Sequence, residues 1–197
     1  MTISQFLSIF ILFISTSLYA QGRFDKVEIT TTKLSDHTYM LQGAGGNIGV
    51  SVGEDGVFVI DDQFAPLSEK ILSAIKALSD KPLRFLVNTH YHGDHTGGNE
   101  NMAKAGATII AHHNVKKRLE SKQHNGSIKP KEALPVITFN DQLSITINDE
   151  SVAIFHVSNA HTDGDVILYF TESNVLHTGD TYFNGRYPYI DLNSGEV

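Results

Sequence analysis

Cysteine is absent from the 197-residue sequence, so the fold contains no disulfide bond and a metal site cannot include a thiolate ligand. Clustered basic residues are also absent: the 15 lysines and arginines are scattered, and the formal net charge is −7. A nucleic-acid partner is therefore not expected, because it would require a concentrated positive surface. No internal repeat or low-complexity tract interrupts the chain. With 41% hydrophobic and 19% charged residues, the composition is typical of one globular domain.

The first twenty residues differ from the rest, because they carry no charge and residues 6–13 are almost wholly apolar. Small residues lead to Ala20, so we expect a secretory signal peptide over residues 1–20 and a mature chain that starts at Gln21. An uncleaved membrane anchor is the alternative, since no Lys or Arg precedes the apolar stretch, but this stretch is short for a membrane span. We accordingly expect the mature protein to be secreted or periplasmic, with no membrane association.

Short apolar runs separated by glycine-containing turns predict a series of strands after the signal peptide. The expected strands are 27–29, 38–41, 47–52, 57–60, 85–87, 108–111, 136–139, 143–147, 152–157, 166–170 and 175–177. We expect the first four to form an antiparallel meander, with residues 53–56 as a hairpin turn between the third and the fourth.

Helical patterns lie between some of these strands. Apolar residues at helical spacing predict an amphipathic helix over 66–78. Shorter helices are expected over 98–105 and over 114–121, the latter capped by Asn114. Residues 123–135 are polar and contain glycine and proline, so we expect a mobile loop there. Strands with interspersed helices predict an α/β fold of layered sheets covered by helices.

Residues 90–95 read HYHGDH and place three imidazoles and one carboxylate directly after the apolar strand 85–87. Neutral imidazole and carboxylate are ligands that zinc accepts, and loops that follow strands commonly carry functional sites. Gly93, Gly97 and Gly98 allow this loop to fold tightly around an ion. A single histidine is more often an ordinary core or surface residue, but four such groups in six positions predict a metal site.

Two later segments also place histidine and aspartate directly after a strand. The first segment, residues 158–165, contains His161, and the second, residues 177–181, contains Asp180. Three loops at strand ends can converge at one edge of a sheet sandwich. The sequence therefore predicts that they enclose a pair of metal ions.

The order and rough spacing of these groups resemble the ligand set of the metallo-β-lactamase superfamily, over residues 38 to about 189. The residues that carry the resemblance are His90, His92, Asp94, His95, His161 and Asp180. The resemblance implies a four-layer αββα sandwich with a dinuclear zinc site at one edge.

The resemblance also implies how the ligands divide between two zinc ions. His90, His92 and His161 would bind the first ion. Asp94 and His95 would bind the second ion. The bridging ligand would come from the His-Thr-Gly-Asp segment, as Asp180.

Two further roles are implied by the same resemblance. Asp61 matches a residue that lies behind the ligands and steadies the motif loop, although a carboxylate that caps a turn is an equally good interpretation. Phe183 stands where lactamases often carry a lysine that grips the substrate carboxylate. Arg186 is the nearest cation and has a guanidinium suited to that task. A solvated surface arginine is the alternative interpretation.

Zinc chemistry indicates a hydrolytic reaction. Zinc lowers the pKa of bound water to about 7, so hydroxide is available at neutral pH to attack a carbonyl that a second ion polarises. Asp94 lies beside the ligand histidines, where a carboxylate can both hold the second ion and orient the attacking hydroxide. The expected function is therefore that of a secreted, β-lactamase-like zinc hydrolase acting on a small molecule with an amide-like or ester-like carbonyl.

Three alternatives stay open from the sequence. Antibiotic-hydrolysing members of the superfamily commonly carry Cys or Ser where Asp180 stands, and Asp there resembles glyoxalase II, a thioester hydrolase. A non-heme di-iron oxidoreductase is less favoured, because such proteins typically carry Glu where His92 stands. A non-catalytic zinc-binding protein is disfavoured by Asp94, since a structural site closes with four ligands and no open position. The sequence leaves the oligomeric state open.

The superfamily supplies a last histidine to the second ion from a later loop, and no histidine follows His177 in this chain. We therefore expect residues 21–197 to form a metallo-β-lactamase-like domain whose second half is incomplete, truncated at its carboxyl end. We expect His177 to support the loop of Asp180. Ordinary structural roles are expected for four further histidines, His112, His113, His124 and His156.

Overall fold

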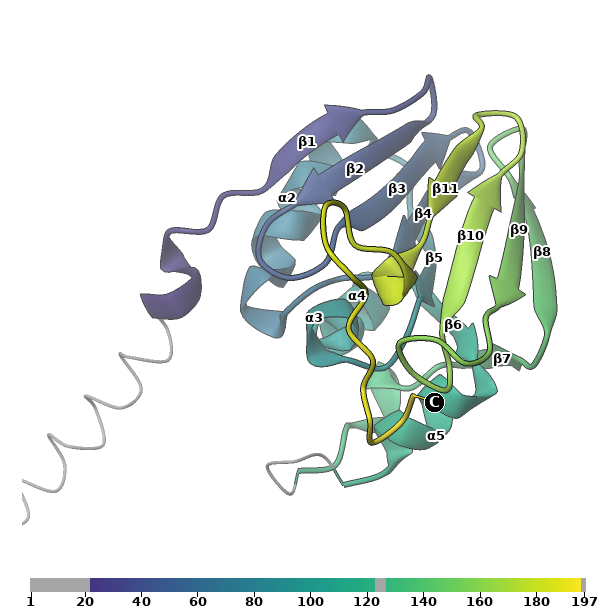
Figure 1. Ribbon diagram of the computed structural model, residues 1–197. Helices are drawn as coiled ribbons and strands as arrows, with labels where there is room; N and C mark the ends of the chain where they lie inside the picture. The colour runs from purple at the N-terminus through teal and green to yellow at the C-terminus, as the bar shows by residue number, and fades with distance from the viewer. Residues whose placement is uncertain (1–21, 123–126, 196–197) are drawn as a thin grey trace, which may run out of the picture.

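Two β-sheets pack face to face in the computed structural model, which describes residues 22–122 and 127–195 (Figure 1). The expected signal peptide, residues 1–20, lies outside the described residues. Within the described part of the chain, no helix combines the length and the apolar character needed to cross a membrane.

The larger sheet contains seven strands in the order β1-β2-β3-β4-β5-β6-β7. Strands β1 to β4 pair antiparallel, and β4 to β7 pair parallel. The expected meander is therefore confirmed for its last three strands. The strands are β1 (Thr30–Lys33), β2 (Thr38–Gln42), β3 (Ile48–Gly53), β4 (Gly56–Ile60), β5 (Leu83–Asn88), β6 (Thr108–His112) and β7 (Ile137–Phe139).

The smaller sheet is antiparallel, with its strands in the order β11-β10-β9-β8. Its strands are β8 (Gln142–Ile147), β9 (Glu150–His156), β10 (Val166–Phe170) and β11 (Val175–His177). Strand β11 lies next to the larger sheet's β3 and β4 in the view of Figure 1. The loop that follows β11 is thereby brought to the same end of the sandwich as the loop that follows β5.

Helices cover the larger sheet. The α-helices are α2 (Ser68–Leu78), α3 (Gly93–Thr96), α4 (Asn99–Lys104) and α5 (His113–Glu120). Short 3-10 helices are η1 (Ala65–Leu67), η2 (Lys131–Ala133) and η3 (Gly179–Thr181). Helices α2 and α4 pack on the face of the larger sheet that is turned away from the smaller sheet, through Ile71, Ile75 and Met102. The expected α/β sandwich is confirmed.

Strand β4 contributes side chains to the cores on both faces of the larger sheet. Successive side chains of a strand point to opposite faces of the sheet. Val57 and Val59 accordingly lie in the core shared with the helices, whereas Phe58 and Ile60 lie in the core between the two sheets. All four are at most 1% exposed, and each contributes about 1.5–3 kcal/mol by leaving water. This central strand is therefore fixed on both faces, and its carboxyl end is a rigid point from which to build a site.

The strand expected over residues 27–29 was wrong, because strand β1 begins at Thr30. Val27 and Ile29 pack against the core between the larger sheet and its helices, but their backbone does not join the sheet. Their apolar character therefore reflects burial and not strand pairing. A lysine side chain supplies hydrogen bonds to backbone carbonyls of this segment. Lys70 Nζ donates to the carbonyl oxygen of Val27 at 2.7 Å and to that of Asp25 at 2.9 Å.

Two local expectations also require correction. The N-cap of α5 is His112, whose Nδ1 accepts a hydrogen bond from the backbone N of Asn114, while the Asn114 side chain donates to the Asp163 carbonyl. The expected mobile loop is wrong for η2, because Ala133 is 3% exposed and its carbonyl accepts a hydrogen bond from Asn99 Nδ2. Residues 123–126 of that loop lie outside the described residues.

Candidate metal centre

The motif loop leaves the carboxyl end of β5, beside the carboxyl end of the parallel neighbour β4. Buried Asn88 ends β5, and its Nδ2 donates to the carbonyl of His95, which ties the end of the loop back to the strand. The backbone N–H groups of His95 and Thr96 donate to the carbonyl of His92, so the chain turns at once into α3. This turn returns Asp94 and His95 toward the strand end.

Three imidazoles form the first candidate ligand group: His90, His92 and His161. The Nδ1 atom of His92 lies 3.1 Å from Nε2 of His90 and 2.9 Å from Nε2 of His161. One ligand atom from each residue lies within 4.8 Å of those of the other two. His161 comes from the loop between β9 and β10, so the two sheets supply this group jointly.

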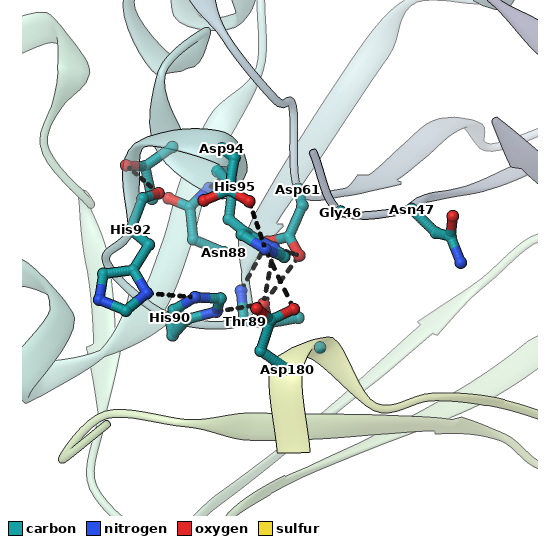
Figure 2. A network of polar contacts seen from close by, with 12 residues as sticks. Gly46, Asn47, Asp61, Asn88, Thr89, His90, His92, Asp94, His95 and Asp180 are labelled. Carbon is teal, nitrogen blue, oxygen red and sulfur yellow. Dashed lines mark hydrogen bonds and ion pairs between the residues drawn. The ribbon is translucent and has the colours of Figure 1, made fainter. Parts of the chain in front are cut away.

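A second candidate group contains His90, His95 and Asp180, again with ligand atoms within 4.8 Å of one another. Asp180 lies in η3, after β11, and its Oδ1 is 3.2 Å from His95 Nε2 while its Oδ2 is 3.6 Å from His161 Nε2. Asp180 thus lies between the two groups. The Oδ2 atom of Asp94 is 3.6 Å from His95 Nε2 (Figure 2). All six expected ligands therefore lie together.

The outward-facing nitrogen of each imidazole has a protein partner. Oxygens accept from, or contact, these nitrogens in four pairs: Thr89 Oγ1 with His90 Nδ1 at 3.1 Å, Asp191 Oδ2 with His92 Nε2 at 3.0 Å, Asp61 Oδ2 with His95 Nδ1 at 2.7 Å, and the Tyr189 carbonyl with His161 Nδ1 at 2.6 Å. Such partners fix the tautomer and ring orientation of histidines that bind metals.

The inward-facing nitrogens fit a metal ion. His95 Nε2 is buried and makes no hydrogen bond to any residue that the structure describes, which is costly unless something else uses its lone pair. Imidazole nitrogens and a carboxylate that converge in this way form a donor set that zinc takes. The residues present therefore fit a pair of metal ions, one at each ligand group.

Burial and neighbouring charges set opposite protonation tendencies in His90 and His95. Burial, reinforced by the neighbouring imidazole of His95, holds the pKa of His90 well below its ordinary value. Burial also acts to lower the pKa of His95, but the carboxylates of Asp61 and Asp180 outweigh it and raise that pKa well above the ordinary value. Burial acts to raise the pKa of Asp180, but the imidazole of His95, with Nε2 3.2 Å from Asp180 Oδ1, outweighs burial and lowers that pKa.

Asp61 contacts the motif loop from behind the ligands. It is fully buried, and its carboxylate accepts from Thr89 N and Thr89 Oγ1 and contacts His95 Nδ1, each at 2.7 Å. Its φ of 62° lies in the left-handed region, which an aspartate tolerates better than most residues. The strained turn directs the carboxylate from the end of β4 into the motif loop.

The β2–β3 loop (residues 43–47) covers the second group from the other side. Gln63 holds this loop, because its Nε2 donates to the Gly46 carbonyl at 2.6 Å and its Oε1 accepts from Ala44 N at 3.1 Å. A Cβ atom on Gly46 would overlap the ring of His95. Only glycine allows the backbone to approach the imidazole this closely.

A cavity of about 500 Å³ opens beside the second group. It is bordered by Asp94, His95, Asp180, Asn47 and Arg186, among others. Arg186 is exposed, and its guanidinium lies 5.0 Å from the centre of the Phe183 ring. The cation that the sequence singled out therefore borders the cavity.

His177 supports the loop of the second ligand group, and His112, His113 and His156 lie outside both groups. His177 Nδ1 accepts from Gly179 N at 3.3 Å, so it contacts the loop of Asp180. His112 stacks on His156 with the ring centres 4.0 Å apart. His113 is exposed at the start of α5, and His124 lies outside the described residues.

No pattern in the sequence indicated Asp191, although it contacts His92 and accepts a hydrogen bond from Tyr91. It lies 99 residues after His92, in a segment with no strand, helix or metal-ligand spacing. Tyr91 lies inside the motif, and its hydroxyl donates to the same Asp191 oxygen that contacts His92.

The family model of the metallo-beta-lactamase superfamily matches residues 42–196 of this chain. A hydroxyacylglutathione hydrolase of Pelagibacter ubique (strain HTCC1062) is 30% identical over 121 residues, which are 56% of this chain and 41% of that protein. The 2,4-dinitroanisole O-demethylase subunit alpha of Nocardioides sp. (strain JS1661) is 25% identical over 137 residues, 68% of this chain and 40% of that protein. The matched region thus spans about two fifths of these relatives.

Solved structures share the fold. A metallo-beta-lactamase of Cronobacter sakazakii superposes with a TM-score of 0.69 at 16% identity, covering 86% of this chain and 68% of its own. A subclass B3 metallo-beta-lactamase of Bradyrhizobium japonicum gives a TM-score of 0.61 at 22% identity, covering 73% of this chain and 57% of its own. At these identities the similarity establishes the sandwich architecture alone.

Proposed function

This chain belongs to the metallo-beta-lactamase superfamily, whose members are metal-dependent hydrolases, and from that premise we propose that it hydrolyses the acyl bond of a small molecule at a pair of zinc ions. One observation carries the proposal: two ligand groups meet at Asp180, beside a cavity of about 500 Å³. A site of this kind has a place for two ions and a place for a substrate.

We propose that the ligands divide as the resemblance implies. In our proposal the first ion takes His90, His92 and His161, the second ion takes Asp94 and His95, and Asp180 bridges the two. Metal ions held there would polarise a carbonyl oxygen and lower the pKa of a water molecule.

Asp94 is the residue we propose to act on the attacking water. Its side chain is 33% exposed and borders the cavity, whereas His95 beside it is 1% exposed. A carboxylate oxygen at this boundary can orient water and hold the proton that water releases. Asp94 thereby combines metal binding with proton transfer.

We place a thioester first among the substrate classes. Asp180 stands where antibiotic-hydrolysing members commonly carry Cys or Ser, and hydroxyacylglutathione hydrolases share 30% identity with the chain over part of its length. A β-lactam is the second candidate, because Arg186 at the cavity offers a cation for a substrate carboxylate. We also propose a secreted or periplasmic location, supported by the apolar, uncharged residues 1–20.

The test is hydrolysis by purified full-length protein supplied with zinc, assayed on S-lactoylglutathione and on nitrocefin. We expect zinc-dependent hydrolysis of the thioester, and loss of that activity in His92→Ala. Replacement of the exposed His113 by Ala is the matched control and should leave the rate unchanged. Preference for nitrocefin would replace the first substrate class by the second, and hydrolysis of neither would contradict both.

A further inference from the structure

We propose that Asp191 is a positioning residue for the metal centre: its carboxylate holds the His92 imidazole so that Nδ1 faces His90 and His161. This inference rests on the proposed function, because it assigns a task at the same site. Asp191 lies outside every strand and helix of the described residues, in the segment that follows η3.

Asp191 is built as a rigid acceptor. Its Oδ2 accepts from the Tyr91 hydroxyl at 2.6 Å and from the Ser194 hydroxyl at 2.8 Å, and it lies 3.0 Å from His92 Nε2. Its Oδ1 accepts from the backbone N of Asn193 at 3.0 Å and from Asn193 Nδ2 at 3.2 Å. The residue is 6% exposed. Donors therefore surround both carboxylate oxygens, and the group cannot turn without breaking several bonds.

His92 needs this acceptor more than the other imidazoles do. His90 and His161 face the first group through Nε2 and are held at Nδ1 by oxygens close to the backbone, on Thr89 and Tyr189. His92 faces the group through Nδ1, so its proton must be on Nε2, the far end of the ring. The Nε2–H group then needs an acceptor on the side of the ring away from the ligand group. The Asp191 carboxylate lies on that side, with Oδ2 3.0 Å from His92 Nε2.

The exposure of His92 leads to the same conclusion. Its side chain is 26% exposed, compared with 3% for that of His161. Packing alone therefore restrains the His92 ring less, and rotation about its broad second side-chain torsion would turn Nδ1 away from the group. The hydrogen bond to Asp191 opposes that rotation.

The same segment also holds a second imidazole of the first group. The Tyr189 carbonyl contacts His161 Nδ1 at 2.6 Å, and Asp191 N donates to the His161 carbonyl at 2.9 Å. His95, in the second group, depends instead on Asp61. Loss of the Asp191 carboxylate should therefore weaken binding of the first ion and leave binding of the second ion unchanged.

The experiment measures stepwise zinc dissociation constants of the full-length protein by competition with a chromophoric chelator. The step lost in His92→Ala identifies the first group, and the step lost in His95→Ala identifies the second. We expect Asp191→Ala to weaken the first step by about 10–100-fold, the usual effect of removing a partner behind a ligand. The second step should change by no more than about twofold, as for independent sites. Asp191→Asn keeps an acceptor without the charge and should lie between the wild type and Asp191→Ala.

Tyr91→Phe is the matched control, because it removes one donor to the same oxygen and leaves the bond to His92. It should weaken the first step by no more than about twofold. In ¹⁵N-labelled zinc-loaded protein, the His92 Nε2–H resonance should be protected from solvent exchange in the wild type and in Tyr91→Phe, and lost in Asp191→Ala.

Three results would overturn the inference while the proposed function stands: an unchanged first step in Asp191→Ala, equal weakening of both steps, or equal losses in Tyr91→Phe and Asp191→Ala. The last two results would mean that zinc binding depends on anchoring of the segment around Asp191 and not on the hydrogen bond between Asp191 and the His92 imidazole. A wild type that binds no zinc in the same titration would overturn both proposals.

Discussion

Asp61 and Asp62 are adjacent, fully buried carboxylates with opposite environments. Asp61 accepts two hydrogen bonds from Thr89 and pairs with His95. Asp62 accepts a hydrogen bond from Gly98 N at 2.8 Å, and within residues 22–122 and 127–195 its Oδ2 has no hydrogen-bond partner. Burial raises the pKa of Asp62 well above its ordinary value, although the hydrogen bond from Gly98 opposes the shift. Asp61 therefore contacts the site through Thr89 and His95, whereas burial favours the protonated form of Asp62.

Asp62→Asn should make the stability of the metal-free protein depend less on pH. Because the folded-state pKa of Asp62 is raised, the native state holds a proton that the unfolded chain releases above about pH 4. The wild type therefore loses this contribution as pH rises, and the variant does not. Relative to the wild type, the free energy of unfolding of Asp62→Asn should therefore rise as the pH increases from about 4.5 to about 8.

Urea unfolding in the presence of a chelator, followed by circular dichroism, measures this difference. Asp25→Asn, at an exposed aspartate, is the control and should follow the wild type at every pH. Parallel pH profiles for the wild type and Asp62→Asn would show that Asp62 is not protonated in the native state.

At the residue scale, the sequence predicted groups that share a short motif and missed those that depend on long loops. The imidazoles of His90, His92 and His95 lie within six positions, so local chemistry was enough to single them out. Asp191 contacts His92 across 99 residues of chain. No local pattern encodes that contact, because it depends on the path of an irregular segment. Resemblance to a known family supplied Asp61, which the sequence alone left ambiguous.

Among the elements, the β2–β3 loop is as important to the site as the motif loop. Gly45 and Gly46 bring its backbone against Asp94 and His95, and Gln63 fixes the approach through two hydrogen bonds. Gly45 also has a φ of 95°, which favours glycine. The loop therefore forms a backbone wall on the side of the second ligand group.

Gly46→Ala should displace His95, because the added Cβ would overlap its ring. We expect zinc binding at the second step to weaken by about 10–100-fold, the effect typical of disturbing the orientation of a ligand. Gly93→Ala is the control, since a Cβ there meets nothing within 4 Å. Chelator competition measures both variants, and equal second-step affinities in the two would contradict the close-approach role of Gly46.

Elements buried on both faces were the easiest to predict. Strands β4 and β5 appear in the sequence as continuous apolar runs bounded by turn or polar residues, and both lie where expected. Residues 27–29 show the limit of this signal, because Val27 and Ile29 alternate as a strand would but pack beside the sheet. An apolar pattern indicates which side chains are buried, but it does not indicate which groups hydrogen-bond to the backbone.

On the scale of the whole molecule, the two sheets meet at the candidate metal centre. The larger sheet supplies the motif loop after β5, and the smaller sheet supplies His161 and Asp180 from loops beside β10 and β11. Phe58 and Phe170 pack edge to face between the sheets, with ring centres 6.1 Å apart, and help to hold these loops in register. The sandwich core is thus the frame that sets the spacing of the ligand groups.

Metal content of the full-length protein tests the central claim most directly. Elemental analysis after zinc loading and removal of free metal should give two zinc ions per chain in the wild type and in His113→Ala, and one in His92→Ala with an unchanged circular dichroism spectrum. Iron at two ions per chain in the protein as purified would replace zinc hydrolase chemistry by the di-iron alternative. A wild type without bound metal, or His92→Ala with two zinc ions, would contradict the dinuclear centre built on these residues.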